Sequence, residues 1–366
     1  MMHYRLLHSS VLLIIVFSFI CCNNPGRAEQ SDPDIVVTDM LGRKVTVPAN
    51  IDKVVALRAG ALRLLVYMDA ADMIAGVEEN EKRSSRPYLL AFPELMKLPS
   101  VGPQMGGDPE LIVAAQPDVI FISYSTVGEA DALQQKTGIP VVAIDCPDLQ
   151  VNSNGLFDSF SLIGKILHKE NRADSLIKGI SSMIEELNTR TSSIKPEDKP
   201  GVYVGGVAYS GAHGIASTHG AFAPFLFVNA NNVVSGKQNI VSSHVKGTNI
   251  DIEQLLLWNP DIIFIDESGY SLALQDINNQ PALKKSLDAI RSNQLYCLLP
   301  YNNYATNYEF VLLNAWFAGK IIYPQQFEDI DIETKASEVL TLFFNKPVSL
   351  SQMKSALGLR KITPVH

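Results

Sequence analysis

Side chains that recognise charged and polar ligands gather in short segments that follow β-prone runs of this chain. Arginine suits an oxyanion or a carboxylate, because its planar guanidinium bonds two oxygens at once and keeps its charge. Tyrosine and asparagine supply apolar surface together with hydrogen bonds, as in the wall of a site for a bulky polar ligand. The candidate ligand-binding residues are Arg58, Arg83, Arg86, Tyr88 and Tyr124 in the first half, and Tyr209, His213, Tyr270, Tyr301, Asn302 and Tyr304 in the second.

Histidine and cysteine offer a second chemistry, metal binding, but their spacing does not favour it. His213, His219 and His244 include no pair four residues apart, and no thiolate accompanies them. Cys146 and Cys297 follow β-prone runs in different halves of the chain and are interpreted as buried free thiols. We therefore expect no resident metal and no cofactor.

Motifs of nucleophilic and nucleotide-dependent enzymes are missing from the sequence. No Gly-x-Ser-x-Gly elbow and no Walker A loop occurs. The run of residues 201–206 is interpreted as a strand with flanking glycines and not as a dinucleotide-binding fingerprint. These patterns predict a binding protein and not an enzyme.

The elements that must position the candidate residues follow a strand-then-helix rhythm. A hairpin is expected over residues 35–47, and strands over 54–57 and 74–77 flank a helix over 61–68. Residues 110–122 align without gaps on residues 253–265, and each copy reads as a short helix, a Pro-Asp turn and a buried strand. This repeat predicts two related α/β lobes. Ligands of such sheets bind beyond the carboxyl ends of the strands, where the candidate residues lie.

One long amphipathic helix is predicted between the lobes, because apolar residues recur every three or four positions from Phe160 to Leu187. An unbroken helix of this length would span about 45 Å. The predicted fold class is α/β, with two doubly wound α/β lobes joined by a single long α-helix. The predicted boundaries are a signal peptide at 1–22, a tether at 23–33, an N-terminal lobe at 34–157, the connecting helix at 158–190, a C-terminal lobe with C-terminal helices at 191–345, and a tail at 346–366.

The N-terminus has the pattern of an export signal. Arg5 precedes a short apolar run at 11–20, which ends at Cys21 and Cys22 before polar residues. A membrane span would need about 20 apolar residues, so a signal peptide is the better interpretation. The cysteine at its end resembles the lipobox of bacterial lipoproteins, which implies lipidation of Cys22, or of Cys21, and a lipid anchor in the membrane. The alternative is an ordinary secretory signal cut near Ala28.

Composition excludes several other classes of protein. The 366 residues are 46% hydrophobic and 19% charged, which is typical of a globular chain and not of a disordered one. Thirty Lys and Arg residues against 38 Asp and Glu residues give a net charge of −8. A chain of this charge has no general attraction to nucleic acid or to an anionic membrane surface, so nucleic acid is not expected as a partner.

Several of these features occur together in one order. They are the cysteine that ends the leader, the hairpin residues 39–43, Val101-Gly102 ahead of Pro109-Glu110, the doubled Pro-Asp motif and the single connecting helix. In this order they resemble the substrate-binding proteins of ABC importers for iron complexes (siderophores or haem) and for cobalamin, over about residues 34–345. The resemblance implies a ligand cleft between the lobes, little hinge closure, and delivery of cargo to a membrane permease that a cytoplasmic ATPase drives.

The resemblance also implies docking on the permease through one acidic residue of each lobe. Glu94 lies near the first such position, whereas residues 222–227, near the second, contain no acid. We therefore expect a monomer in the periplasm or on the cell surface that captures a metal chelate, either a ferric siderophore, haem or cobalamin. A small oxyanion such as molybdate or tungstate, or a bare metal ion, is the alternative cargo, and a structural or sensor lipoprotein is the alternative of another class.

Overall fold

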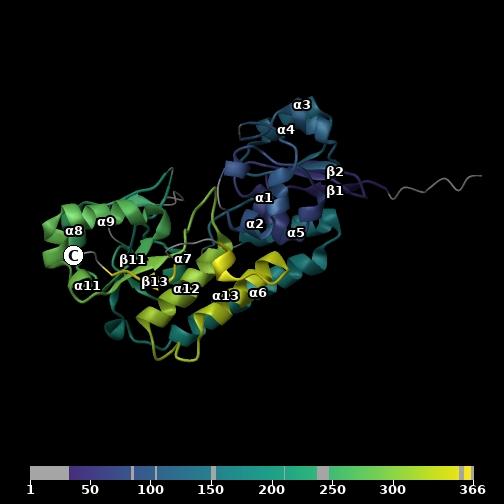
Figure 1. The fold of residues 1–366 in the computed structure, drawn as a ribbon. Helices are drawn as coiled ribbons and strands as arrows, with labels where there is room; N and C mark the ends of the chain where they lie inside the picture. Colours follow the sequence, from purple (N-terminus) through teal and green to yellow (C-terminus); the bar gives the residue numbers. More distant parts are fainter. Residues whose placement is uncertain are drawn as a thin grey trace, which may run out of the picture.

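The computed structural model describes residues 33–83, 86–103, 105–149, 154–209, 211–236, 247–353 and 358–363. In this part of the chain, two α/β lobes lie side by side (Figure 1). The predicted signal peptide with Cys22, and also His244, lie outside these ranges, and of the predicted tether only Pro33 is described. Among the described residues, no helix combines the length and the apolar character that crossing a membrane requires.

The N-terminal lobe contains a parallel sheet with the strand order β4-β3-β5-β6. Its strands are β3 (Val54–Leu57), β4 (Ile74–Gly76), β5 (Val119–Ile122) and β6 (Val141–Ala143), and an antiparallel hairpin of β1 (Ile35–Thr38) and β2 (Lys44–Val47) precedes them. Its helices are α1 (Ala61–Tyr67), α2 (Pro87–Ala91), α3 (Pro109–Ala115) and α4 (Val127–Thr137). Every residue of β3, β5 and β6 is buried, because helices cover both faces of the sheet.

The C-terminal lobe contains a sheet with the strand order β13-β12-β11-β7-β9. Its strands are β7 (Gly201–Gly205), β9 (Asn231–Asn232), β11 (Ile262–Asp266), β12 (Leu295–Leu298) and β13 (Arg360–Lys361), and β8 (Ser217–Thr218) pairs separately with β10 (Thr248–Asn249). Its helices are α7 (Ala223–Phe227), α8 (Ile252–Trp258), α9 (Tyr270–Asn279), α10 (Pro281–Ser286) and α11 (Asp288–Arg291). Residues 346–366 were expected to be a tail, but they contribute β13 to the edge of this sheet, antiparallel to β12.

The repeated motif forms α3 and β5 in the first lobe and α8 and β11 in the second, as the self-match predicts. Both helices end on a left-handed residue, Gln116 (φ 52°) or Asn259 (φ 39°), just before the Pro-Asp pair. The Asp118 carboxylate accepts a hydrogen bond from the Lys53 N–H at 2.8 Å, next to the start of β3. The Asp261 carboxylate accepts one from the Gly201 N–H at 2.6 Å, at the start of β7. In both lobes the repeated aspartate thus fixes the beginning of the neighbouring parallel strand.

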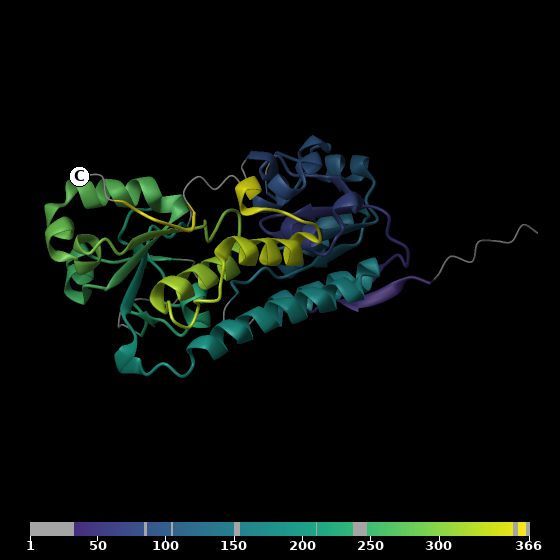
Figure 2. The same ribbon diagram turned by 60° about the horizontal axis from the view of Figure 1, so that its bottom comes forward.

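The prediction of one unbroken helix over 158–190 is wrong. The segment forms two helices, α5 (Asn154–Leu167) and α6 (Glu170–Thr191), which pack against each other. The chain turns at His168, whose left-handed backbone (φ 53°) ends the first helix and whose ring Nε2 lies 2.8 Å from the Ala49 carbonyl oxygen. Only α6 therefore continues to the second lobe, and Figure 2 shows it beneath both lobes.

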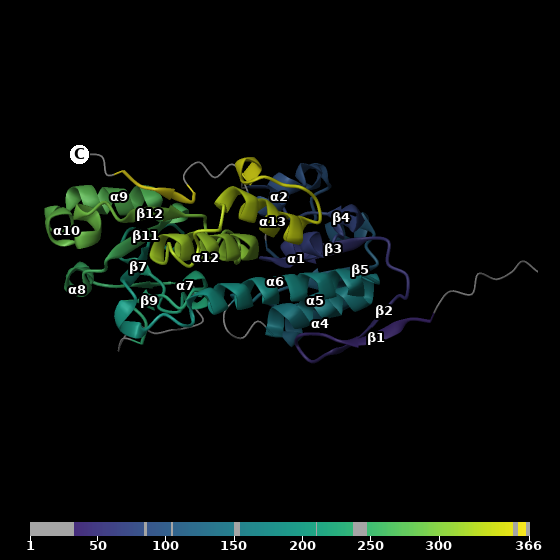
Figure 3. The same cartoon turned by 90° about the horizontal axis from the view of Figure 1, so that it is seen from below.

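The two lobes share one hydrophobic core. The helices α12 (Tyr308–Ile322) and α13 (Ile332–Phe344) lie between β12 and β13 in the chain and run alongside α6 (Figure 3). One cluster of buried side chains runs from β3 and α1 through α5, α6, α12 and α13 to β7 and α7. At its N-lobe end, the ring centroid of Tyr67 lies 4.7 Å from that of Phe343 and 5.9 Å from that of Phe344. The end of the chain therefore helps to build the first lobe.

Replacement of Phe343 by alanine should lower the free energy of unfolding by about 3–5 kcal/mol, because it leaves a cavity in the shared core. Urea unfolding followed by circular dichroism and by tryptophan fluorescence should show a single transition for the wild type and for the variant. Leu257→Ala is the control, since this side chain is 78% exposed and its loss should change the free energy by less than about 0.5 kcal/mol. Two separate transitions in the wild type would contradict a shared core.

Candidate ligand-binding site

A cleft of about 680 Å³ lies between the lobes. Its lining residues are Ala59, Met105, Ala208, Tyr209, Gly211, Ser268, Pro300, Asn302, Asn303, Tyr304 and Ala305. Ala59 follows β3 in the first lobe, and the C-lobe residues follow β7, β11 and β12. The cleft therefore lies beyond the carboxyl ends of the parallel strands, where the fold brings loops of both sheets together.

Arg58 lies at the edge of this cleft in a left-handed conformation (φ 70°) and is already paired. Its Nη1 donates a hydrogen bond to the Tyr124 carbonyl oxygen at 2.6 Å, and its Nη2 lies 3.1 Å from Glu129 Oε1. Hydrogen bonds from Arg58 and Thr126 lower the pKa of the Glu129 carboxyl to about 2. Because the Glu129 side chain is half exposed, an anionic ligand could replace it on Arg58 without opening the fold.

The expected convergence of arginines on the cleft is not found for Arg86. This residue is buried, its Nη1 lies 2.7 Å from Glu81 Oε2, and its guanidinium lies 4.3 Å from the ring centroid of Tyr304. Tyr88 is fully buried as well and donates its hydroxyl hydrogen to Glu81. Both residues thus lie in a layer behind the cleft wall, because their charge and hydroxyl are satisfied there by Glu81. The side chain of Arg83 is outside the described part of the structure.

The C-lobe wall of the cleft contains Tyr209, Asn302 and Tyr304 of the predicted ligand-binding residues. The Tyr209 ring stacks on the His213 ring at 4.1 Å with an interplanar angle of 15°. The Nε2 atom of His213 lies 2.8 Å from the Tyr209 carbonyl oxygen, and Asn302 Nδ2 donates to the Ala208 carbonyl oxygen at 3.3 Å. His213 therefore supports Tyr209 from behind and does not itself line the cleft.

Three further predicted tyrosines do not line the cleft. Tyr124 is exposed beside Arg58, and its hydroxyl donates to the Cys146 carbonyl oxygen at 2.8 Å. Tyr270 starts α9 and packs against the outer core of the second lobe. Tyr301 is fully buried beneath the wall. Sequence position after a strand thus places a residue near the cleft but does not decide which way its side chain points.

Two buried carboxylates, which the sequence analysis did not single out, hold the cleft loops. Glu78 accepts hydrogen bonds from the backbone N–H groups of Arg58 at 2.8 Å and of Gly106 at 2.5 Å. Asp266 accepts them from Tyr301 at 2.7 Å and from Ser268 at 2.9 Å. Burial raises the pKa of Glu78 to about 7 and that of Asp266 to about 6, against the effect of these N–H groups. An acidic residue at the end of an apolar strand, or shortly after it, was the available signal for both.

Metal-ligating residues do not come together in the described ranges, where no group of three or more His, Cys, Asp or Glu residues could hold an ion. His219 is buried and its Nδ1 accepts the Ala221 N–H at 3.1 Å, so it has a structural partner. Cys146 and Cys297 are buried free thiols, as predicted. The described residues thus offer a ligand a polar and aromatic cleft and no preformed metal centre.

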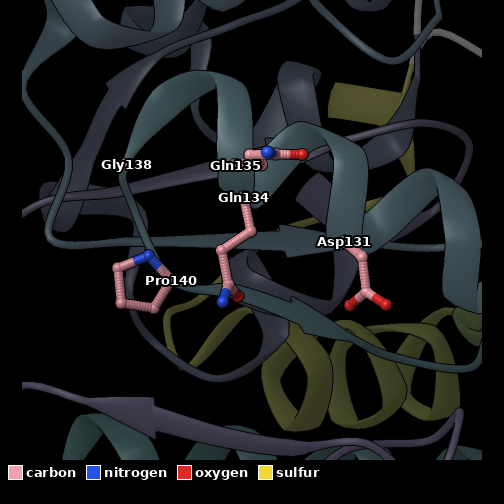
Figure 4. Close-up of a pocket in the computed structure, with 5 residues that line it drawn as sticks. All are labelled: Asp131, Gln134, Gln135, Gly138 and Pro140. Carbon is pink, nitrogen blue, oxygen red and sulfur yellow. The ribbon is translucent and has the colours of Figure 1, made fainter.

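A second hollow, of about 490 Å³, lies on the outside of the first lobe (Figure 4). It is lined by Asp131, Gln134, Gln135, Gly138 and Pro140, at the end of α4 and the start of β6. Asp131 is paired with Arg43 at 2.7 Å, and Gln134 Oε1 accepts the Val141 N–H at 3.0 Å. These polar groups already stabilise the lobe, so the cleft between the lobes is the better candidate site.

Comparison with known proteins gives the fold a family. Residues 54–301, which include most of both lobes, match the family model described as "Periplasmic binding protein". The chain belongs to this family. As a member, it is a periplasmic substrate-binding protein of the ABC-transporter type, which confirms the resemblance inferred from the order of motifs.

Similar proteins bind different cargoes on this fold. The molybdate-binding protein MolA of Haemophilus influenzae is 25% identical over 332 residues, which are 85% of this chain and 91% of MolA. The MolA structure with bound molybdate superposes with a TM-score of 0.67 at 22% identity, covering 86% of this chain and 99% of MolA. A solute-binding protein of Veillonella parvula has a TM-score of 0.71 at 20% identity (88% and 97% covered), and Helicobacter pylori CeuE in its nickel–histidine complex has 0.60 at 17% (88% and 99% covered). At these identities the structures show a shared two-lobed fold, and that part of the prediction is confirmed.

Stability should fall as pH rises from about 4.5 to about 7, because of Glu78. Its native pKa lies above its ordinary value of 4.5, so the folded state holds the proton more tightly and is penalised when the carboxyl ionises. The contribution is fully present below pH 4.5 and is lost as pH rises through 7, with an upper limit of about 3–4 kcal/mol. Urea unfolding at pH 5 and pH 8 should therefore show a smaller loss of stability for Glu78→Gln than for the wild type.

Glu129→Gln is the matched control for this pH series. The pKa of Glu129 is lowered, so its contribution changes only in acid and the difference between pH 5 and pH 8 should match that of the wild type. Equal pH dependence in the wild type and in Glu78→Gln would show that Glu78 does not carry the effect.

Proposed function

We propose that this periplasmic binding protein captures a metal chelate, of the ferric siderophore, haem or cobalamin kind, in the cleft between its lobes and passes it to a membrane permease that a cytoplasmic ATPase drives. The size of the cleft supports this proposal. A volume of about 680 Å³ falls in the range of about 300–1,000 Å³ that is typical of sites for drug-sized ligands. A bare oxyanion with four oxygens would fill only a small part of it.

The chemistry of the lining points in the same direction. The wall offers the Tyr209 ring, the side chains of Asn302 and Asn303 and the apolar Met105, which together suit a large ligand with mixed polar and apolar surface. Arg58 at the edge adds one positive charge, and the exposed Glu129 carboxylate forms an ion pair with it. An anionic chelate could displace Glu129 there and gain a charge-assisted hydrogen bond.

A molybdate-like oxyanion is the second candidate, because MolA is similar to this chain along most of its length. A bare oxyanion is held by several N–H donors that point at it. In this chain the Gly106 N–H and the Arg58 N–H, both beside the cleft, already donate to Glu78. The occupation of these donors by an internal carboxylate is the observation that supports the chelate over the bare oxyanion.

The lipid anchor and the docking surface remain proposals that accompany this function. Lipidation at Cys22 would keep the protein at the membrane, and replacement of both Cys21 and Cys22 by alanine should move it from the membrane fraction to the soluble fraction.

Glu94, exposed between α2 and α3, would contact the permease. Glu94→Lys should lower uptake at unchanged cargo affinity, and unchanged uptake would remove Glu94 from the interface.

The cargo can be identified on protein purified without added ligand. Mass spectrometry of metals and small molecules, followed by calorimetric titration with a ferric catechol siderophore, haemin, cyanocobalamin, nickel–histidine, molybdate and tungstate, should give one-to-one binding of a chelate. Tight binding of molybdate or tungstate without binding of any chelate would establish the second candidate. Absence of binding to all of these, with normal uptake after gene deletion, would favour a structural or sensor lipoprotein.

Tyr209→Ala should weaken binding of the cargo about tenfold or more, because it removes an aromatic ring that lines the cleft. Tyr209→Phe should retain most of the affinity if the ring provides the contact. Gln135→Ala, in the outer hollow of Figure 4, is the matched control and should leave the dissociation constant unchanged. Equal affinity of Tyr209→Ala and the wild type would exclude this part of the cleft from the site.

A further inference from the structure

The segment between β12 and α12, residues 301–307, forms the back of the cleft and is called the wall loop here. Asn302, Asn303, Tyr304 and Ala305 all line the cleft. Two of them have left-handed backbones, Tyr304 with φ 56° and Ala305 with φ 75°. This conformation is unfavourable for residues with a Cβ atom. The loop has an internal hydrogen bond from the Asn303 N–H to the Ala305 carbonyl oxygen at 3.0 Å, and contacts from outside the loop add to it.

Arg63 provides such contacts from the other lobe. It lies on α1, is fully buried, and is not among the residues that line the cleft. Its Nη1 donates to the Thr306 carbonyl oxygen at 2.5 Å, and its Nη2 donates to the Asn303 carbonyl oxygen at 2.9 Å. These two carbonyls flank the left-handed pair on either side. A third bond, from Nη2 to Asn307 Oδ1 at 2.8 Å, extends the contact to the end of the loop.

Other N-lobe groups complete the support of the wall loop. The Arg86 guanidinium lies behind the Tyr304 ring at 4.3 Å, and the Thr306 hydroxyl bonds to Asp148. Gly60 lies so close that an added Cβ would be 3.1 Å from Ala305 Cβ. The loop thus belongs to the second lobe by sequence, but its conformation depends on the first.

The charge of Arg63 is permanent in this environment. Burial disfavours it, but the nearby Tyr67, Tyr88 and Glu309 raise the pKa of the guanidinium above its ordinary value. Glu309 is itself held by the Tyr67 hydroxyl. The planar fork of arginine matches two carbonyl oxygens on one side of a loop, which an ammonium group or a neutral side chain cannot reproduce.

We propose that Arg63 is a positioning residue for cargo binding: it fixes the left-handed turn of the wall loop from behind and so gives the cleft the shape that binds. The effect on affinity rests on the proposed function, whereas the effect on the loop does not. If the loop adopts the binding conformation only part of the time without Arg63, the apparent affinity falls by that fraction.

Hydrogen exchange of the ligand-free protein tests whether Arg63 fixes the conformation of the wall loop. In Arg63→Met, the amides of the wall loop should exchange about tenfold faster or more than in the wild type. Arg172→Met is the matched control. Arg172 also joins α6 to other elements through carbonyls, those of Tyr67 at 2.7 Å and Leu342 at 2.7 Å, but these lie outside the wall loop. Its loss should leave wall-loop exchange unchanged, and faster exchange in both variants or in neither would overturn the proposal.

Titration with the chelate that the wild type binds best tests whether this conformation contributes to cargo affinity. Arg63→Met should raise the dissociation constant about tenfold or more, and Arg172→Met should not. If Arg63→Met does not fold, Arg63→Lys, which keeps the charge without the fork, should show both effects to a smaller extent. Adding Ala305→Gly to the Arg63 variant should restore part of the affinity, because glycine accepts a left-handed backbone.

The outcomes separate the two proposals. Faster wall-loop exchange with unchanged affinity, or no recovery with Ala305→Gly, would overturn the positioning role. Lack of chelate binding by the wild type would instead contradict the proposed function, and the exchange measurements would then still decide whether Arg63 fixes the loop.

Discussion

The hydrophobic core that passes from the first sheet through α5, α6, α12 and α13 to the second sheet is the constraint on which the cleft depends. A site built from two lobes has a defined shape only when the lobes keep a fixed position relative to each other. Here the same buried side chains stabilise both, so relative movement would expose apolar surface such as the contact of Tyr67 with Phe343. The cleft is therefore a stable hollow between two parts of one folding unit.

Buried polar side chains hold the loops that reach the cleft in their conformations. Glu78, Asp266 and Arg63 are buried, and each bonds mainly to backbone groups of segments that reach the cleft. Burying a charge is unfavourable unless hydrogen bonds satisfy it, so these residues hold their loops strongly once the bonds are formed. The three thus form a supporting layer behind a cleft surface that is mostly aromatic, amide and apolar.

The sequence predicts the architecture well, because the architecture rests on local patterns. The Pro-Asp repeat marks α3 with β5 and α8 with β11, and its aspartate has the same hydrogen-bonding role in both lobes. The break between α5 and α6 could not be predicted from periodicity, because the apolar spacing continues across His168 and neither glycine nor proline marks the turn.

The candidate site was predicted only in part. Tyr209 and Arg86 both lie in loops that follow a strand, but Tyr209 lines the cleft whereas Arg86 lies behind it. Arg63 had a local signal, since it is the only charged residue of the apolar helix α1, but its partners are about 240 residues away in the chain.

The position of α13 has a consequence for how the protein is made. This helix and the 3₁₀ turn at Leu350–Met353 lie near the end of the chain but pack on α1 and α2 near its beginning. In a polypeptide that emerges from its N-terminus first, α1 is available long before α13, so an apolar face of the first lobe stays uncovered until α13 has followed. Contacts of such sequence separation also slow folding, because a long loop must close before they form. The first lobe therefore reaches its final packing only after α13 and the Leu350–Met353 turn have docked on it.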